Sequence, residues 1–468
     1  MSIIMIGAKH VLCIASVWPP VVVGLWALGA QPAGAQTLAE ALAGAYATNP
    51  TLSAARAELR AVNEGVPQAL ANWRPNVTVT GSAGKQRIDS QSGFLTNRQT
   101  TTPFEATARL IQPLYRGGRT TAATERAQHE VRAQRSTLDS VEQSILLRAS
   151  TAYMDVWRDQ AVVEFNINNE RVIERQLEAT EDRFTVGEVT RTDVAQAETR
   201  LAIATAERIA AEGALRTGRA VYEEVIGSRP GVLAPAPPVE DLPASLEDVI
   251  ELAVSRNPDV LAASFAEKAA RRRVREVVGE LLPSVQINAS LSHSEETNQR
   301  SGETDRAQIL AEVTIPLYQQ GAVSSRVREA KQISNQRRIE IDESRRRIEQ
   351  EAISAWEGLQ TARAQIRSFE WGVRAAEIAL EGVRQENAVG ARTILDILDA
   401  EQELLDSQVN LVRSQRDEIV AGFEVLSAIG RLSARDLNLP VEIYNPEVDY
   451  LKVRNTWFDL GEPLVSQD

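Results

Sequence analysis

The sequence VGARTILDILD, residues 389–399, decides the fold because it interrupts two long helical patterns. An earlier copy, VGEVTRTD, occupies residues 186–193. Three residue types recur between the two copies at a constant separation of 203 positions: Gly187 and Gly390, Thr190 and Thr393, Asp193 and Asp396. The chain is therefore built twice around the same turn between two helices.

The first 35 residues have the pattern of a secretory signal peptide. Lys9 and His10 precede an uncharged stretch at 11–30, and a small-x-small cleavage site follows at 33–35. The alternative is an uncleaved membrane helix, which the two prolines at 19–20 disfavour. We expect an exported protein, with residues 1–35 removed.

Composition narrows the function further. The only cysteine, Cys13, lies inside the signal, so we expect neither disulfides nor a metal thiolate in the mature protein, and no cofactor or metal. The formal net charge is −13 and no basic patch stands out, so nucleic acid is not an expected partner. Aromatic residues make up only 5%, which suits long, closely packed helices better than a thick globular core.

Two repeats follow the signal, at 36–227 and 245–430, joined by a proline-rich linker at 228–244. Each repeat opens with a short helix, and Thr37 is a candidate N-cap of the first. An Asn-Pro pair then breaks the pattern at Asn49 and again at Asn257, and a second helix follows to about Trp73 in the first repeat. Residues 431–468 are expected to strap onto the helices.

Alternating apolar and polar residues predict one β-hairpin per repeat, at about 76–113 and 284–316, with loops at about 88–102 and 294–306. Such strands fit either a soluble sheet packed on a helix or a membrane β-barrel. Four strands cannot close a barrel, so the membrane alternative requires several chains to pool strands. Two chains would supply eight strands and three would supply twelve.

Each repeat continues with a proline-free helix, at about 119–186 and 322–389, and a return helix, at 190–226 and 393–429. In the second long helix, apolar residues recur in steps of four and three, a period that demands coiled-coil packing. These positions are Ile348, Ala352, Ala355, Leu359, Ala362, Ile366, Phe369, Val373, Ala376, Leu380 and Val383. A hollow cylinder of helices and a solid bundle both satisfy this pattern, and the need to pool strands favours the cylinder.

The turns between helices carry the candidate site. Thr190 with Asp193, and Thr393 with Asp396, have the spacing of capping boxes, and Gly187 and Gly390 are helix stops. We call Gly187, Thr190, Gly390 and Thr393 the tip turns. Asp399 lies one turn beyond Asp396, too deep to cap the helix. In an oligomer, Asp396 and Asp399 would form stacked rings of carboxylates that attract cations and raise carboxylate pKa values.

The mature chain resembles the TolC family of outer-membrane efflux and secretion channels. The resemblance is carried by the duplicated Asn-Pro, by Pro-Leu-Tyr at 113–115 and 316–318, and by the two tips at 186–193 and 389–400. It implies a mainly α fold with a small membrane β part. Three chains would share a 12-stranded β-barrel in the outer membrane, four strands per chain, and a long α-helical tunnel through the periplasm.

The family resemblance also implies partners and a gate. The expected partners are two further copies of the chain, outer-membrane lipid, a periplasmic adaptor, and an inner-membrane transporter of the resistance-nodulation-division or ATP-binding cassette type, as in efflux pumps and type I secretion systems. Arg392 would bond Thr192 and Asp193 of a neighbouring protomer, as a latch that holds the entrance shut. Asn387 stands where some members carry a tyrosine that also contacts the acid, and Asp396 and Asp399 would form the constriction.

Two other classes remain as alternatives. An enzyme is not expected, because the mature chain has only His129 and His293, far apart in sequence, and lacks a nucleophile or phosphate-cradling motif. A periplasmic coiled-coil scaffold or adaptor without a pore would also explain the long helices. The sequence does not identify the cargo of a channel.

Overall fold

A computed structural model describes residues 35–92, 95–297 and 302–459, and nearly all of the expected signal peptide lies outside these residues. The first repeat contains α1 (Leu38–Thr48), α2 (Pro50–Asn63), α3 (Gly65–Leu70), η1 (Ala71–Trp73), β1 (Asn76–Ala83), β2 (Gln86–Ser92), β3 (Leu95–Thr101), β4 (Phe104–Arg116), α4 (Arg119–Thr185) and α5 (Arg191–Ile226). The second contains α6 (Leu246–Arg256), α7 (Pro258–Val278), η2 (Gly279–Leu281), β5 (Ser284–Glu295), β6 (Glu303–Thr314), α8 (Ala322–Ala388) and α9 (Ile394–Ala428). A short helix, α10 (Pro446–Arg454), follows.

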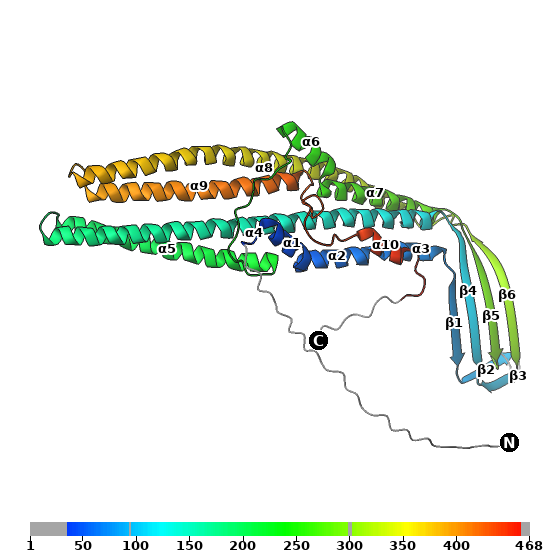
Figure 1. The fold of residues 1–468 in the computed structure, drawn as a ribbon. Helices are drawn as coiled ribbons and strands as arrows, with labels where there is room; N and C mark the ends of the chain where they lie inside the picture. The colour runs from blue at the N-terminus through cyan, green and yellow to red at the C-terminus, as the bar shows by residue number, and fades with distance from the viewer. Residues whose placement is uncertain (1–34, 93–94, 298–301, 460–468) are drawn as a thin grey trace, which may run out of the picture.

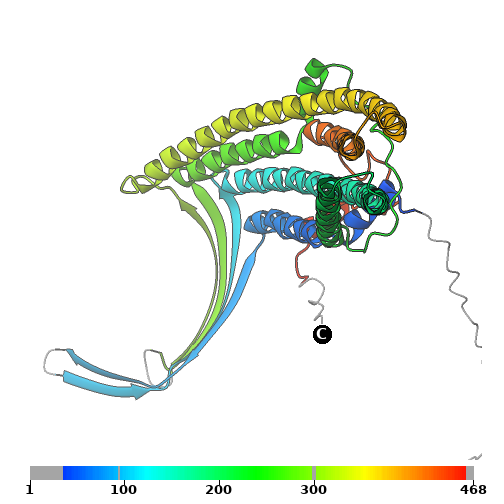
Figure 2. The same cartoon turned by 90° about the vertical axis from the view of Figure 1, so that its left-hand side faces the viewer.

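The two long helices, α4 and α8, organise the molecule, and each is 67 residues long. Shorter helices lie end to end along them: α2 and then α5 along α4, and α7 and then α9 along α8. The two repeats meet where α4 contacts α7 and α9, so the helices lie side by side across the molecule (Figure 2). All the apolar seam positions predicted for α8 are buried or half-buried.

None of the helices in the described part of the chain combines the length and the apolar character that crossing a bilayer requires.

The Asn-Pro pairs close each repeat on itself. The Asn49 side-chain oxygen caps α2 by accepting from the backbone of Thr51 at 2.9 Å, while its Nδ2 donates to the Val225 carbonyl at 3.0 Å. Asn257 does the same in the second repeat, capping α7 and donating to the Ala428 carbonyl at 3.1 Å. Both side chains are buried. Each asparagine therefore joins the start of the second helix to the end of the return helix, and satisfies a carbonyl that the helix itself leaves free.

The single helix expected up to Trp73 is wrong, because three shorter pieces, α2, α3 and η1, replace it. Pro67 lies within this region and has no backbone N–H to donate, which weakens helical hydrogen bonding here. The second repeat has no proline between Pro258 and Pro283, and α7 accordingly continues without a break to Val278.

The strands of the two hairpins form one antiparallel sheet in the order β1-β4-β5-β6. The return strand of the first hairpin, β4, thus pairs with the first strand of the second, β5. The sheet extends from one end of the helical part and curves strongly (Figures 1 and 2). One face of it is apolar and exposed: Val79 is 76% exposed and Ile309 is 77% exposed. An exposed apolar face of this kind requires a covering that the single chain does not supply.

The loop expected at 88–102 is wrong, because β2 and β3 form a second, two-stranded sheet there. Its residues are almost all polar, so the chain shows no apolar alternation that could have predicted it. The ribbon is instead held by its backbone ladder and by ion pairs of Asp89 with Arg98, at 3.0 Å, and with Arg87, at 3.6 Å. It projects beyond the end of the four-stranded sheet (Figure 2).

The linker and the C-terminal segment wrap the middle of the helical part. The Tyr153 hydroxyl on α4 lies 2.7 Å from the carbonyl oxygens of both Gln36 and Ala234, and so ties the start of the first repeat to the linker. The C-terminal segment crosses α2 and α3. Its Glu447 pairs with Arg135 of α4 at 2.6 Å. Both segments are therefore held by specific contacts; residues 460–468 of the expected strap lie outside the described part.

Because Asn49 makes two kinds of hydrogen bond, replacing it should destabilise the protein more than replacing a residue that only caps a helix. Asn49→Ala removes a helix cap and also leaves the buried Val225 carbonyl without its donor, so it should lower the free energy of unfolding by roughly 2–4 kcal/mol. Ser245→Ala removes only an exposed cap of α6 and should cost about 1 kcal/mol. Guanidinium titrations of the purified protein measure both. Equal losses would show that the Asn49 Nδ2 bond contributes nothing.

The helix tips as a candidate gate

The first tip joins α4 to α5. Gly187, at φ 80°, adopts the left-handed conformation that ends α4. Thr190 then begins α5: its backbone N–H and its hydroxyl both donate to Asp193 Oδ2 at 2.8 Å. The Asp193 backbone N–H lies 3.4 Å from Thr190 Oγ1, which completes the reciprocal capping box. Asp193 is therefore held by its own helix start.

The second tip repeats this geometry between α8 and α9. Gly390 has φ 79°, and Thr393 donates from its backbone N–H and its hydroxyl to Asp396 Oδ2 at 2.8 and 2.7 Å. No heavy atom lies within 4 Å of a Cβ added at Gly390, so the left-handed backbone alone accounts for glycine at this position. Both tips are thus hydrogen-bonded turns at the exposed ends of helix pairs.

Hydrogen bonds to the ionised form lower the pKa of both tip carboxylates. For Asp193 the larger contribution comes from the Thr190 backbone N–H, and for Asp396 it comes from the Thr393 hydroxyl. Arg392 lowers the pKa of Asp396 further. Within one chain, therefore, both carboxylates are charged at neutral pH. The upward shift expected for rings of carboxylates would arise only where several chains bring them together.

Arg392 is held by its own tip. Its Nε donates to Glu386 Oε2 at 2.9 Å, and its Nη1 lies 3.7 Å from Asp396 Oδ1. The hydrogen bond with Glu386 raises the pKa of Arg392. Asn387 donates from Nδ2 to the Arg392 carbonyl at 2.8 Å, so it positions the backbone of this arginine and not an acidic side chain.

The chain does not bring Arg392 to its own Thr192 and Asp193, which belong to the other tip. Such a contact would have to come from a neighbouring protomer, as the family resemblance implies. Glu386 does not stand out in the sequence, because it lies in the last turn of α8 among several exposed charges. Nothing in its spacing distinguishes it from those neighbours.

Asp399 has a partner from the other repeat. It forms an ion pair with Arg200 of α5, although its exposed fraction is 56%. Near this pair, the start of α9 packs on the first repeat through an apolar cluster of Ile394, Leu398, Ile173 and Ala204. The second repeat thus docks on the first directly behind the tips, and Arg200 neutralises one of the two carboxylates expected in the constriction.

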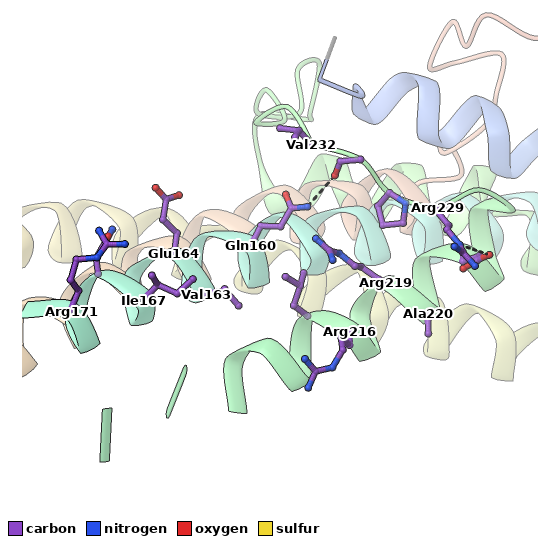
Figure 3. A pocket seen from close by; sticks show the side chains of 15 residues that line it. Gln160, Val163, Glu164, Ile167, Arg171, Arg216, Arg219, Ala220, Arg229 and Val232 are labelled. Carbon is purple, nitrogen blue, oxygen red and sulfur yellow. Dashed lines mark hydrogen bonds and ion pairs between the residues drawn. The ribbon is translucent and has the colours of Figure 1, made fainter. Parts of the chain in front are cut away.

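A surface cavity of about 1000 Å³ lies between α4, α5 and the linker, away from the tips (Figure 3). Arg171, Arg216, Arg219 and Arg229 line it. Gln160 donates to the Gly231 carbonyl at 3.1 Å and Arg229 pairs with Glu223 at 3.4 Å, so the linker is anchored along its edge. This cavity belongs to the attachment of the linker and not to the gate.

Long paired helices with charged tips at one end, and a sheet with an exposed apolar face at the other, define a protein that spans a compartment and enters a membrane. The sequence profile of the family described as "Outer membrane efflux protein" matches residues 41–227 and 249–431. The chain belongs to this family, and its place is the outer membrane. The family consists of efflux proteins and not of enzymes, which supports the expectation of a protein without catalysis.

Individual relatives agree with this assignment. The chain is 36% identical over 437 residues to the outer membrane efflux protein BepC of Brucella suis, covering 93% of this chain and 94% of BepC. It is 26% identical over 417 residues to the outer membrane protein TolC of Vibrio cholerae, covering 86% and 92%. The fold resembles the CmeC outer membrane channel of Campylobacter jejuni with a TM-score of 0.77, 14% identity and 89% of each chain covered.

The capping box predicts a local effect at the second tip. Thr393→Ala removes the hydroxyl that bonds Asp396, so amide hydrogen exchange in the first turn of α9 should accelerate roughly three- to tenfold. Exchange followed by mass spectrometry measures this. Thr199→Ala is the control, because the Thr199 hydroxyl bonds only the Ala195 carbonyl within its helix. Unchanged exchange near residue 394 would show that the box does not hold the tip.

Proposed function

We propose that the protein is the exit duct of a tripartite efflux pump or type I secretion system, with its entrance gated by the helix tips. The main support for the proposal is that the two ends of the molecule differ: the sheet with its apolar face lies at one end of α4 and α8, and the charged tips lie at the other. A 67-residue helix spans roughly 100 Å. One chain therefore reaches from a membrane far into the adjoining compartment.

Closure of the duct requires more than one copy. In the described part of the chain, β1 and β6 each pair on one side only, so both edges of the four-stranded sheet are open. An open edge in lipid leaves backbone groups unsatisfied at several kcal/mol each. Three copies joined β6 to β1 would close a 12-stranded barrel, and α5 and α8, at the two sides of the tip end, would meet their counterparts around a tunnel.

The latch is proposed at the contact between these neighbours. Arg392 is half-exposed, and its pairs with Glu386 and Asp396 leave its guanidinium near the surface of the tip. A guanidinium offers five donors in a fork, so it can bond a neighbour's Thr192 and Asp193 while keeping Glu386. The Asp193 carboxylate has one oxygen, Oδ1, that its own capping box does not use.

The latch predicts leaky channels when either partner is removed. Arg392→Ala and Asp193→Ala should each raise the single-channel conductance of the purified protein in planar lipid bilayers, because each opens the same contact. Arg338→Ala, an exposed arginine far from the tips on α8, should leave conductance at the wild-type value. If neither tip variant changes conductance, the latch is wrong. If the wild-type protein forms no channels at all, the duct itself is wrong and a pore-free scaffold is favoured.

The constriction is proposed at Asp396 and Asp399. Three copies would bring their carboxylates into two rings, which select cations by charge. Arg200 offsets part of this field, because it pairs with Asp399 within each chain. The net selectivity is therefore set by Asp396, by Asp399 and by the position of Arg200 together.

The two carboxylates and their arginine predict opposite changes in selectivity. Asp396→Asn and Asp399→Asn should reduce the permeability of potassium relative to chloride, and Arg200→Ala should increase it, because it leaves Asp399 unneutralised. Reversal potentials across a salt gradient measure this ratio. Arg338→Ala again serves as the control. A loss of cation preference in Arg200→Ala would place Asp399 outside the conduction path.

The proposed partners are those that the family resemblance implies. A periplasmic adaptor and an inner-membrane transporter of the resistance-nodulation-division or ATP-binding cassette type would supply cargo at the tips. Nothing in the described residues distinguishes small molecules from secreted protein as cargo. A gene deletion, scored both for drug susceptibility and for secreted proteins, separates the two.

A further inference from the structure

The apolar face of the sheet ends abruptly on β5 and β6. On this face β5 presents Val285, Ile287, Ala289 and Leu291, and β6 presents the residues opposite them, Val313, Ala311, Ile309 and Ala307. The next two positions on the same face are charged or polar on both strands: His293 opposite Asp305, and Glu295 opposite Glu303. Four groups able to bind a metal thus follow directly after the last apolar pair.

The histidine lies between the acids of both strands. Its Nδ1 is 2.7 Å from Asp305 Oδ1 and 4.0 Å from a Glu303 carboxylate oxygen. Its Nε2 is 3.1 Å from Glu295 Oε1. The Phe104 ring on the neighbouring strand β4 packs edge-on at 6.3 Å between ring centroids, which fixes one side of the imidazole. Each ring nitrogen therefore has a defined acidic partner.

We propose that His293, Asp305 and Glu303 form a zinc site that joins β5 to β6 at the boundary of the apolar face. One ligand atom from each of these residues already lies within 4.8 Å of the others. Ligand atoms around a tetrahedral zinc ion, bound at about 2.0–2.1 Å, lie about 3.4 Å apart. The two distances from Nδ1, 2.7 and 4.0 Å, bracket this value, so small side-chain rotations suffice.

The chemistry of the donors favours zinc over magnesium and calcium. An imidazole nitrogen with two carboxylate oxygens suits Zn²⁺, whereas Mg²⁺ and Ca²⁺ take oxygen ligands alone. Glu295 supplies the outer partner that metal-bound histidines require. With zinc bound, the nearby Glu295 carboxylate would accept from Nε2–H, which would leave the lone pair of Nδ1 for the metal and increase the basicity of that nitrogen. A solvent molecule would complete the four ligands.

The position gives the site a structural use. The strand β6 is the outer strand of the sheet within one chain, and its pairing with β5 reaches its end at Glu295 and Glu303. Without a metal, three carboxylates face a single imidazole there and repel one another. A divalent cation offsets this excess negative charge and crosslinks the two strands where the apolar face ends.

Zinc binding by the untagged, full-length protein in detergent tests the site. After chelator treatment, titration of Zn²⁺ against a chromophoric competitor should give one bound ion per chain. His293→Gln and Asp305→Asn should abolish this binding. Glu295→Gln should keep the stoichiometry but weaken the affinity roughly tenfold or more, as expected for an outer partner. His129→Gln is the matched control, since His129 lies on α4, and should bind as the wild type does.

Two results would overturn the proposal: no zinc binding by the wild type, or wild-type binding by His293→Gln. X-ray absorption at the zinc edge of the wild-type protein gives a readout that does not depend on the folding of any variant. The site requires an imidazole nitrogen among the ligands, and a shell of oxygens alone would exclude it. Millimolar Mg²⁺ should not displace the bound zinc. Full displacement would show that the carboxylates alone bind the ion, and it would contradict a zinc site that uses His293.

Discussion

The structure depends on a single constraint: a helix of 67 residues with an apolar seam along its length cannot bury that seam alone. Each fully buried leucine or isoleucine contributes about 1.5–3 kcal/mol, so a seam of this length must be covered from end to end. Two shorter helices placed end to end supply the cover, α2 and α5 on α4, and α7 and α9 on α8. The two repeats use the same arrangement, because each covers one long helix with two shorter ones.

The weak point of such a design is the junction between the two covering helices. Four carbonyls at the end of one helix and four N–H groups at the start of the next lack partners within their helices. Asn49 and Asn257 meet both needs at once, since an amide is a donor and an acceptor on one short side chain. The proline that follows each asparagine has no N–H to satisfy at the first helical position. The Asn-Pro pair is thus a joint between helices as well as a break in them.

The sequence was sufficient where the determining contacts are periodic or local. The seam of α8 follows from its spacing, and the tip turns follow from glycine, threonine and aspartate within a few residues. It was insufficient where partners are distant or interchangeable. The second hydrogen bond of Asn49 reaches Val225, far along the chain. The β2–β3 ribbon is held by backbone hydrogen bonds, and its polar sequence has no alternating pattern that would predict strands. Arg392 could pair with any nearby acid, and only the turn geometry selects Glu386.

The gate that we propose requires helix tips that can move at the end of rigid paired helices, and the ion pairs at the tips are weak enough to allow this. Arg392 with Glu386, and Arg200 with Asp399, are largely exposed, and exposed pairs contribute only about 0–1 kcal/mol each. The contact that we propose between Arg392 and an acid of a neighbouring protomer would be an exposed pair of the same kind, so it can form and break at little cost in free energy. The apolar seam, by contrast, is far too costly to separate along its whole length. Opening should accordingly redistribute weak charge pairs at the last turns, while the paired helices behind them keep their packing.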